Sequence, residues 1–277
     1  MRKAITPGEI ELLGRLVKEK SGIFLDQSKA YLFESRLSHL LEEFDVHTYK
    51  DLHGLILQDR SGAVCARVVE ALCTHETSFF RDKSPFSLLA GRLAPEFFRH
   101  CADKTLHILS AACATGQEVY SAAMILADAG FAPPTHQVRF VAADISDAAI
   151  AAASLGVYTK FELARGLDSV RLHKYFNREG ENAWRIKDEI RSMVFFKKAN
   201  LLDPQAVAAL GKFNIVLCRN VAIYFSLEDK RRLFACLETV LNPKGNLIVG
   251  ATESLLGVTD RFARFEDRET VYYGLFA

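Results

Sequence analysis

Short apolar runs alternate with longer amphipathic stretches from residue 106 to the end of the printed sequence. The runs have the length of β-strands and the stretches the spacing of helices that bury one face. We predict strands at residues 106–111, 138–143, 194–196, 213–218 and 247–250, with TVYYGLFA as a last strand. The helices between them fall at residues 115–130, 146–155, 204–210 and 227–241. Because a strand, a crossover helix and a parallel strand form a right-handed unit, the alternation predicts a doubly wound α/β sheet.

The first 75 residues lack this alternation and have apolar stripes at helical spacing. The stripes consist of Ile10, Leu13 and Val17, and of Phe33, Leu37, Leu40, Leu41 and Phe44. Asp26 and Thr48 have the side chains that helix N-caps prefer. We therefore predict an all-helical N-terminal domain at residues 1–75, a linker at residues 76–90 and an α/β domain at residues 91–277.

Residues 156–193 form a stretch that is too long for one crossover helix. Within it lies FNREGENAWRIKD, a turn-rich segment between short β-prone runs. Turn residues between such runs are typical of a β-hairpin. We expect an inserted antiparallel β-subdomain at about residues 156–195.

The bulk composition excludes several functional classes. Lys and Arg number 35 against 34 Asp and Glu, so no net field gathers nucleic acid or anionic lipid. The first ten residues have no apolar run, and no stretch of the sequence is long and apolar enough to span a membrane. The six cysteines form no CxxC pair and no zinc-ligand spacing. We expect a cytoplasmic protein with reduced thiols, no bound metal and no inserted membrane segment.

The first strand of the predicted sheet leads into a small-residue turn. The sequence HILSA continues as ACATGQEVYSAAMI, so Gly116 directly precedes a helix whose first N–H groups face the crevice. Such a turn suits a carboxylate or a polar ligand edge, although a glycine here also serves simple turn geometry. The sequence has no GxGxxG at this point, which disfavours a nicotinamide enzyme.

The second strand ends in an aspartate. Asp144 lies 28 residues after Gly116, where a carboxylate can accept hydrogen bonds from both hydroxyls of a ribose. Asp144 could instead cap the following helix, but Ser146 fits that role at least as well. Both interpretations remain open from the residues alone.

Polar residues also follow the fourth strand and occupy the linker. FNIVLCRN ends in Arg219 and Asn220, with Tyr224 shortly after, and these are either site residues or a solvated loop. The linker contains THETSFFRD at residues 74–82, a polar and aromatic cluster of the kind that lines pockets. The alternative is that Phe79 and Phe80 pack between domains while Arg81 forms a salt bridge.

Taken together, these segments resemble the CheR-type chemotaxis receptor methyltransferases. The resemblance covers nearly the whole chain and rests on THETSFFRD, ATGQEVYSAAM, AADIS, ANLL, FNIVLCRNVAIYF and GATESL. It implies a helical N-terminal domain joined to an S-adenosylmethionine-binding α/β domain with an inserted β-subdomain. The implied activity is methylation of glutamate side chains on the cytoplasmic helical region of chemoreceptors, with S-adenosylhomocysteine as the second product.

The resemblance also implies the roles of particular residues. Cofactor contacts are expected at Thr77, Arg81, Glu118, Asp144, Asn200, Leu201, Cys218 and Arg219, with His75 and Gly116 as further cofactor positions. Arg81 and Tyr224 are expected nearest the transferred methyl group, as the catalytic pair.

Three positions depart from the family pattern at the cofactor motifs. His75 replaces an asparagine, Gln117 an acid and Val119 a proline, whereas Glu118 is retained. A histidine can still donate a hydrogen bond, so cofactor binding is expected to survive.

Two further departures concern the acceptor. The helix at residues 27–44 balances basic with acidic residues where relatives are basic, so receptor recognition is expected to differ. The loop at residues 177–183 is short, which predicts that the chain does not tether to a receptor's C-terminal pentapeptide. The alternative function is a signalling adaptor that binds the cofactor with little catalysis. A methyltransferase for nucleic acid or a small molecule is disfavoured by the neutral charge.

Overall fold

The computed structural model describes residues 4–101 and 104–276. The chain forms two compact units. One contains the residues up to Thr74 together with Tyr224–Asp229, and the other contains His75–Ile223 and Lys230–Ala277. No helix in the described ranges has the length and apolar character that a membrane crossing requires.

The first unit is helical. Its elements are α1 (Pro7–Ser21), the 3-10 turn η1 (Gln27–Lys29), α2 (Ala30–Glu43), α3 (Tyr49–Gln58) and α4 (Ala63–Leu72). Thr48 caps α3 in a capping box with Asp51, and Asp26 caps η1, as the sequence predicts. The predicted stripes are buried except for Phe44, which lies half-buried just beyond α2.

A short segment from late in the chain packs with these helices. The backbone N–H of Phe24 donates to the carbonyl oxygen of Tyr224 at 2.9 Å, and Ile23 forms an antiparallel bridge with Phe225. Tyr224 therefore belongs to the helical unit, although the sequence places it directly after residues of the α/β unit.

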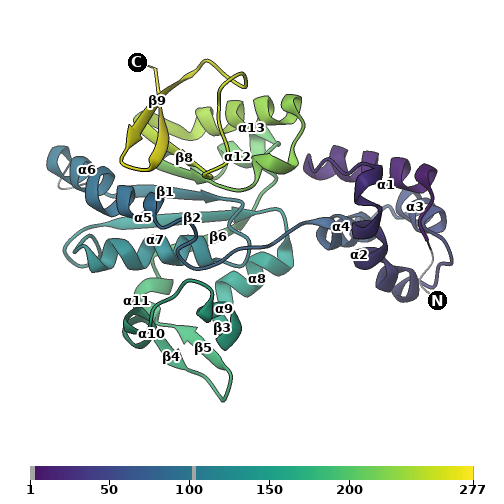
Figure 1. Ribbon diagram of the computed structural model, residues 1–277, viewed down its shortest axis with the longest axis horizontal. Coiled ribbons are helices and arrows are strands. Elements are labelled where there is room, and N and C mark those ends of the chain that lie inside the picture. Colours follow the sequence, from purple (N-terminus) through teal and green to yellow (C-terminus); the bar gives the residue numbers. More distant parts are fainter. Residues whose placement is uncertain (1–3, 102–103, 277) are drawn as a thin grey trace. The chain divides into compact units, whose positions relative to one another are not determined.

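The second unit is built on a seven-stranded sheet with helices on both faces (Figure 1). Its principal strands are β1 (Leu106–Ala111), β2 (Val138–Asp144), β6 (Val194–Lys198), β7 (Phe213–Cys218), β8 (Leu241–Val249), β9 (Phe262–Asp267) and β10 (Thr270–Leu275). Its helices are α5 (Ser84–Leu88), the π-helical η2 (Leu89–Leu93), α6 (Ala94–His100), α7 (Gln117–Asp128), α8 (Asp147–Leu155), α12 (Pro204–Ala208) and α13 (Leu227–Val240), the last from Lys230 onward. The strand order is β6-β2-β1-β7-β8-β10-β9. This confirms the predicted doubly wound α/β class.

The parallel register places the carboxyl ends of five strands at one edge. Ala111 at the end of β1 pairs with Ala143 on one side and with Cys218 on the other. Asp144 pairs with Lys198, and Cys218 pairs with Val249. Because β2 and β6 lie on one side of β1 whereas β7 and β8 lie on the other, the order reverses there, and ligands of open α/β sheets bind at such a switch point.

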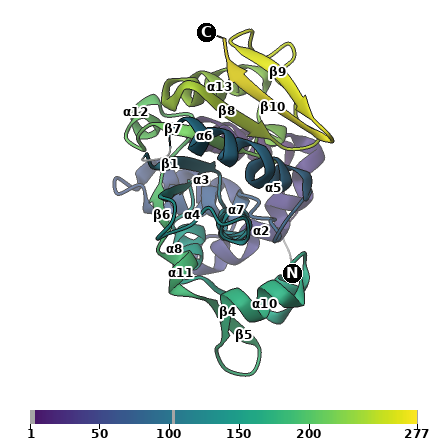
Figure 2. The same ribbon diagram turned by 90° about the vertical axis from the view of Figure 1, so that its left-hand side faces the viewer.

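The C-terminal end of the sheet differs from the prediction. Only one strand is expected after residue 250, but β9 and β10 form an antiparallel hairpin, with β10 also antiparallel to β8 (Figure 2). In β9 the residues between the buried Phe262 and Asp267 are half-buried or exposed. An edge strand of this kind lacks the apolar run on which the prediction depended.

The insertion is a small sheet with one strand more than the expected hairpin. β4 (Phe176–Arg178) and β5 (Ala183–Ile186) form the hairpin, and β3 (Val157–Thr159) adds to its other side. Three short helices accompany them: α9 (Lys160–Ala164), α10 (Ser169–Tyr175) and α11 (Asp188–Arg191). β3 has three residues, too few for a periodic pattern to predict it.

An aspartate at the end of α7 connects the insertion to the main sheet layer. The Asp128 carboxylate accepts hydrogen bonds from Arg171 Nε at 2.9 Å, Lys174 Nζ at 2.6 Å and the Tyr175 hydroxyl at 2.7 Å. Partial burial opposes ionisation of Asp128, but these bonds outweigh it and lower the pKa of the carboxyl. The Asp128 carboxyl is therefore ionised at neutral pH.

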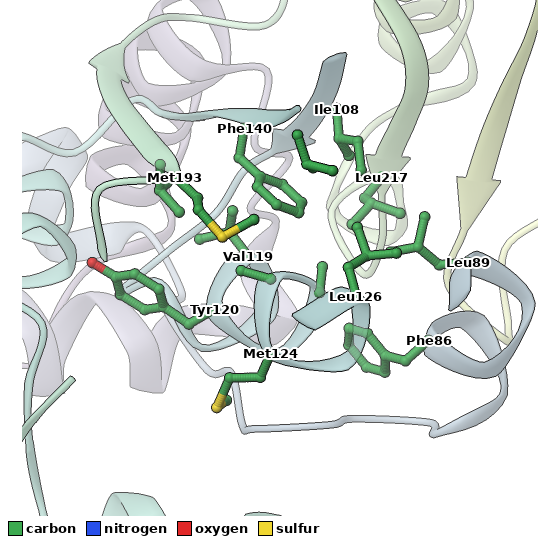
Figure 3. Close-up of a cluster of buried hydrophobic side chains, with 14 of the residues drawn as sticks. Phe86, Leu89, Ile108, Val119, Tyr120, Met124, Leu126, Phe140, Met193 and Leu217 are labelled. Atoms are coloured by element: carbon green, nitrogen blue, oxygen red, sulfur yellow. The ribbon is translucent and has the colours of Figure 1, made fainter. Parts of the chain in front are cut away.

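The core of the α/β unit lies between the sheet and α5 to α7. Figure 3 shows Ile108, Phe140 and Leu217 from the sheet facing Val119 and Leu126 of α7, with Phe86 and Leu89 beside them. Phe79 of the linker is also fully buried, and its ring meets the edges of Tyr158 and Phe176 from the insertion. Phe79 and Phe80 both belong to this core, so packing between domains, the alternative interpretation of these residues, does not describe their surroundings.

The contact between linker and insertion depends on Gly166. Its φ is +104°, and an added Cβ would lie 1.9 Å from the carbonyl oxygen of Phe79. We predict that Gly166→Ala destabilises the protein by about 2 to 5 kcal/mol, the sum of left-handed strain and overpacking. Gly180→Ala is the matched control, because Gly180 has a φ of +79° and open space around it, so its cost is about 1 to 2 kcal/mol. Urea denaturation measures both, and equal losses contradict the packing argument.

Candidate functional site

The turn after β1 has an unusual backbone. Ala112, Ala114 and Gly116 all have positive φ, at 61°, 47° and 94°. The N–H of Cys113 donates to the Ala143 carbonyl, which ties the turn to the end of β2. An added Cβ at Gly116 would lie 3.0 Å from the Tyr158 hydroxyl, so a side chain here would be crowded as well as strained by the positive φ. Gly116 is the N-cap of α7 and gives that helix no side-chain cap, which leaves its start suited to a polar ligand.

Asp144 is buried at the end of β2 and is bound on both carboxylate oxygens. Oδ2 accepts from the N–H of Ala114 at 2.9 Å, and Oδ1 accepts from the N–H of Ser146 at 3.0 Å. Ser146 itself caps α8 through its hydroxyl, so the helix does not need Asp144 as its cap. Each carboxylate oxygen retains capacity for a further hydrogen bond. Asp144 is thus held in place with acceptor positions left over for ligand hydroxyls.

Arg219 is the most buried charged side chain of the edge, with 1% of its side-chain surface exposed. Its NH1 group donates to Glu118 Oε2 at 3.0 Å, and its NH2 group donates to Asp82 Oδ2 at 2.9 Å and to the Arg81 carbonyl at 2.8 Å. Ser110 donates to the other Glu118 oxygen at 2.8 Å. One guanidinium therefore joins the end of β7, the start of α7 and the linker.

The linker is fixed against the start of α7. The N–H of Phe80 donates to the Ser121 hydroxyl at 2.9 Å, and the φ values of Phe80 and Asp82 are positive, at 49° and 53°. The Arg81 side chain donates to the Glu76 carbonyl at 3.3 Å, so the alternative of a salt bridge for Arg81 finds no support among the described contacts. The linker thereby places His75 beside Asp144, with the His75 Nε2 atom 3.9 Å from the Asp144 Oδ1 atom.

Asn200 and Leu201 directly follow the part of the chain that pairs with Asp144. The N–H of Ala199 donates to the Asp144 carbonyl at 2.8 Å, and Asn200 Oδ1 accepts from the N–H of Leu202. Leu201 is buried.

Cys218 is buried at the end of β7. Burial, followed by the nearby carboxylates of Glu253 and Glu118, raises the pKa of its thiol well above the usual value. A thiol with a raised pKa is a poor nucleophile, so Cys218 contributes shape and backbone to the edge.

The hydrogen bonds described above do not include two of the expected site residues. Thr77 is half-buried in the extended linker segment, and Tyr224 packs with the helical unit. Their roles remain predictions.

Sequence reasoning missed other residues that build the edge: Ser110, Asp82, Ser121 and Glu253. A serine inside an apolar strand and the acid in GATESL were signals for two of them.

Two buried nitrogens at this edge of the sheet bear on ligand binding. In the described part of the chain, His75 Nε2 and Arg219 Nε have no hydrogen-bond partner. A buried unpaired donor typically costs about 1 to 3 kcal/mol, so such atoms point to a missing partner. With the Gly116 turn and the Asp144 acceptors, they supply hydrogen-bonding groups of the kind that the ribose and aminoacyl groups of S-adenosylmethionine require. No group of three or more His, Cys, Asp or Glu within the described ranges is arranged to hold a metal.

The fold and its switch-point edge define an α/β protein with a nucleoside-type binding site. Residues 75–271 match the protein-family model described as "CheR methyltransferase, SAM binding domain", and residues 8–73 match "CheR methyltransferase, all-alpha domain". The chain belongs to the CheR methyltransferase family, and its cofactor is S-adenosylmethionine.

Curated relatives match along nearly their whole length. The Pseudomonas putida protein named "Chemotaxis protein methyltransferase Cher2" is 37% identical over 94% of this chain and 95% of its own. "Chemotaxis protein methyltransferase 1" of Pseudomonas aeruginosa is 37% identical over 96% and 97%. "Chemotaxis protein methyltransferase" of Vibrio parahaemolyticus is 36% identical over 98% of each chain.

The position of Asp144 predicts its effect on binding. Asp144→Ala removes the expected ribose acceptor and the partner of the Ala114 N–H, so we expect at least about 100-fold weaker binding of S-adenosylhomocysteine by calorimetry. The control is Asp168→Ala, which removes an exposed aspartate N-cap of α10 and costs about 1 kcal/mol of stability. That variant should bind with unchanged affinity. Equal affinities for Asp144→Ala and the wild type would exclude Asp144 from the cofactor site.

Proposed function

We propose that this chain acts in the cytoplasm and transfers the methyl group of S-adenosylmethionine to glutamate side chains on chemoreceptors. The acceptors lie in the cytoplasmic helical region of the receptor, and the products are glutamate methyl esters and S-adenosylhomocysteine. The observation that carries the proposal is the edge formed by the Gly116 turn, Asp144 and the Glu118–Arg219 pair in a chain of the CheR family. Neither nucleic acid nor membrane insertion is part of this function.

The chemistry needs alignment rather than proton transfer. A glutamate side chain is already ionised near neutral pH, so it attacks without a general base. When bound, the cofactor supplies an electrophilic sulfonium methyl group. Attack neutralises two opposite charges, so a crevice that excludes water favours the reaction. Fixing both partners in line can supply roughly 7 to 11 kcal/mol of the barrier.

The residues at the carboxyl ends of the strands have different roles in this reaction. Asp144 binds the ribose, while the Gly116 turn and Glu118 position the aminoacyl group. His75, Thr77, Asn200, Leu201, Cys218 and Arg219 complete the cofactor site. Arg81 and Tyr224 act nearest the methyl group, where Arg81 positions the cofactor, since a tight grip on the acceptor oxygen would weaken it as a nucleophile.

Recognition of the receptor differs from that of basic relatives. In α2 the Arg36 side chain donates to the carbonyls of Leu72 and Cys73, and Glu43 pairs with Arg67, so these two charges are engaged inside the helical unit. β4 ends at Arg178 and β5 begins at Ala183, which leaves a short turn. We propose that the insertion does not tether to a C-terminal pentapeptide.

Methyl transfer to receptor membranes tests the proposal. Membranes containing the chemoreceptors of the source organism are incubated with the protein and S-adenosylmethionine labelled in the methyl group. We predict label in the receptor band that alkali releases as methanol, which is the behaviour of a methyl ester. A receptor lacking its last five residues should be methylated at the same rate, because no tether is involved.

The control is Asp144→Ala, which should give no label. Tight binding of S-adenosylhomocysteine with no transfer to any receptor preparation would contradict catalysis and support the adaptor alternative. Label that resists alkali would contradict esterification.

A further inference from the structure

Glu253 occupies the space between the ends of β7 and β8. Its Oε2 atom accepts from the N–H of Asn220 at 2.6 Å and from the N–H of Gly250 at 2.7 Å. Its Oε1 atom accepts from the N–H of Ile223 at 3.2 Å. One half-buried carboxylate thus receives three backbone donors from two loops of the carboxyl edge.

The segment that it holds is the exit loop of β7, residues 219–223. Asn220 has a φ of +59°, a left-handed conformation that costs a non-glycine residue energy. The hydrogen bond from its N–H to Glu253 stabilises that conformation. Arg219 begins the exit loop, and Tyr224 directly follows it in the chain.

Gly250 leaves room for this carboxylate because it has no side chain. A Cβ at position 250 would lie 2.6 Å from Glu253 Oε2 and 2.9 Å from the backbone nitrogen of Asn220. The glycine therefore allows the two loops to approach as closely as the hydrogen bonds require.

We infer that Glu253 is a positioning residue for methyl transfer, which it serves by fixing the exit loop of β7 through backbone hydrogen bonds. It positions the end of the exit loop next to Tyr224, which is proposed to lie near the transferred methyl group, more than the end that begins with Arg219. Arg219 is held separately by Glu118, Asp82 and the Arg81 carbonyl, whereas Ile223, one residue before Tyr224, is held by Glu253. The inference rests on the proposed function for its kinetic consequence and on geometry alone for the order of the loop.

Hydrogen exchange tests the geometric part without any substrate. In Glu253→Ala we expect the amides of Asn220, Ile223 and Gly250 to exchange at least about tenfold faster, because their shared acceptor is lost. Glu253→Gln keeps one carbonyl oxygen but turns an amide donor toward another N–H, so it should fall between the wild type and Glu253→Ala. Glu266→Ala is the control, since Glu266 lies exposed on β9 and pairs only with Arg264 among the described residues. Unchanged exchange in a folded Glu253→Ala overturns the inference.

Kinetics test the functional part. With receptor membranes as acceptor, Glu253→Ala should lower kcat at least about tenfold, while the Kd for S-adenosylhomocysteine changes less than about threefold. A wild-type kcat, or a loss confined to cofactor affinity, overturns the positioning role. A wild-type protein that transfers no methyl group refutes the proposed function instead, and the exchange data still decide the role of Glu253 in the loop.

Gly250→Ala disturbs the same contact from the β8 loop. It provides a second test if Glu253→Ala does not fold. Its methyl group should displace the carboxylate and reproduce the fall in kcat. Adding Gly250→Ala to Glu253→Ala should cost less than it does alone, because the carboxylate that it displaces is already gone. Additive losses in kcat would mean that the two positions act independently and would contradict the mechanism.

Discussion

The buried guanidinium of Arg219 is the interaction on which the site depends. A charge with 1% of its side-chain surface exposed must be paired, and Arg219 meets this need with Glu118, Asp82 and the Arg81 carbonyl. Breaking such a pair typically costs about 3 to 5 kcal/mol, because the other charge stays buried. The linker, the start of α7 and the end of β7 are therefore fixed together.

The strand order of the sheet determines where this network lies. Placing β2 and β7 on opposite sides of β1 brings Asp144 and Cys218 to the same edge as the Gly116 turn. The loops of this edge then divide into two halves. In the proposed function Asp144 and the turn bind the cofactor, while the exit loop of β7, held by Glu253, serves the methyl acceptor. Two carboxylates that accept backbone N–H groups thus set the geometry on each side.

Much of this arrangement follows from sequence patterns with strong periodicity. The bounds of β1 and β7 agree with the prediction because both strands are mostly apolar runs of strand length. β3 and β9 were missed, since one is very short and the other mostly exposed. The partners of Arg219 could not be predicted either. Asp82 and Glu118 are each separated from it by more than a hundred residues, and only the folded sheet brings them together.

The most direct test of this account is the affinity of Arg219→Lys for S-adenosylhomocysteine, measured by calorimetry. A lysine keeps the positive charge, but its single ammonium cannot match the planar fork that reaches Glu118, Asp82 and the Arg81 carbonyl together. We predict binding at least about tenfold weaker, or about 1.4 kcal/mol, in a protein that still unfolds cooperatively. Wild-type affinity in Arg219→Lys would show that charge alone suffices and would contradict the central role of the guanidinium network.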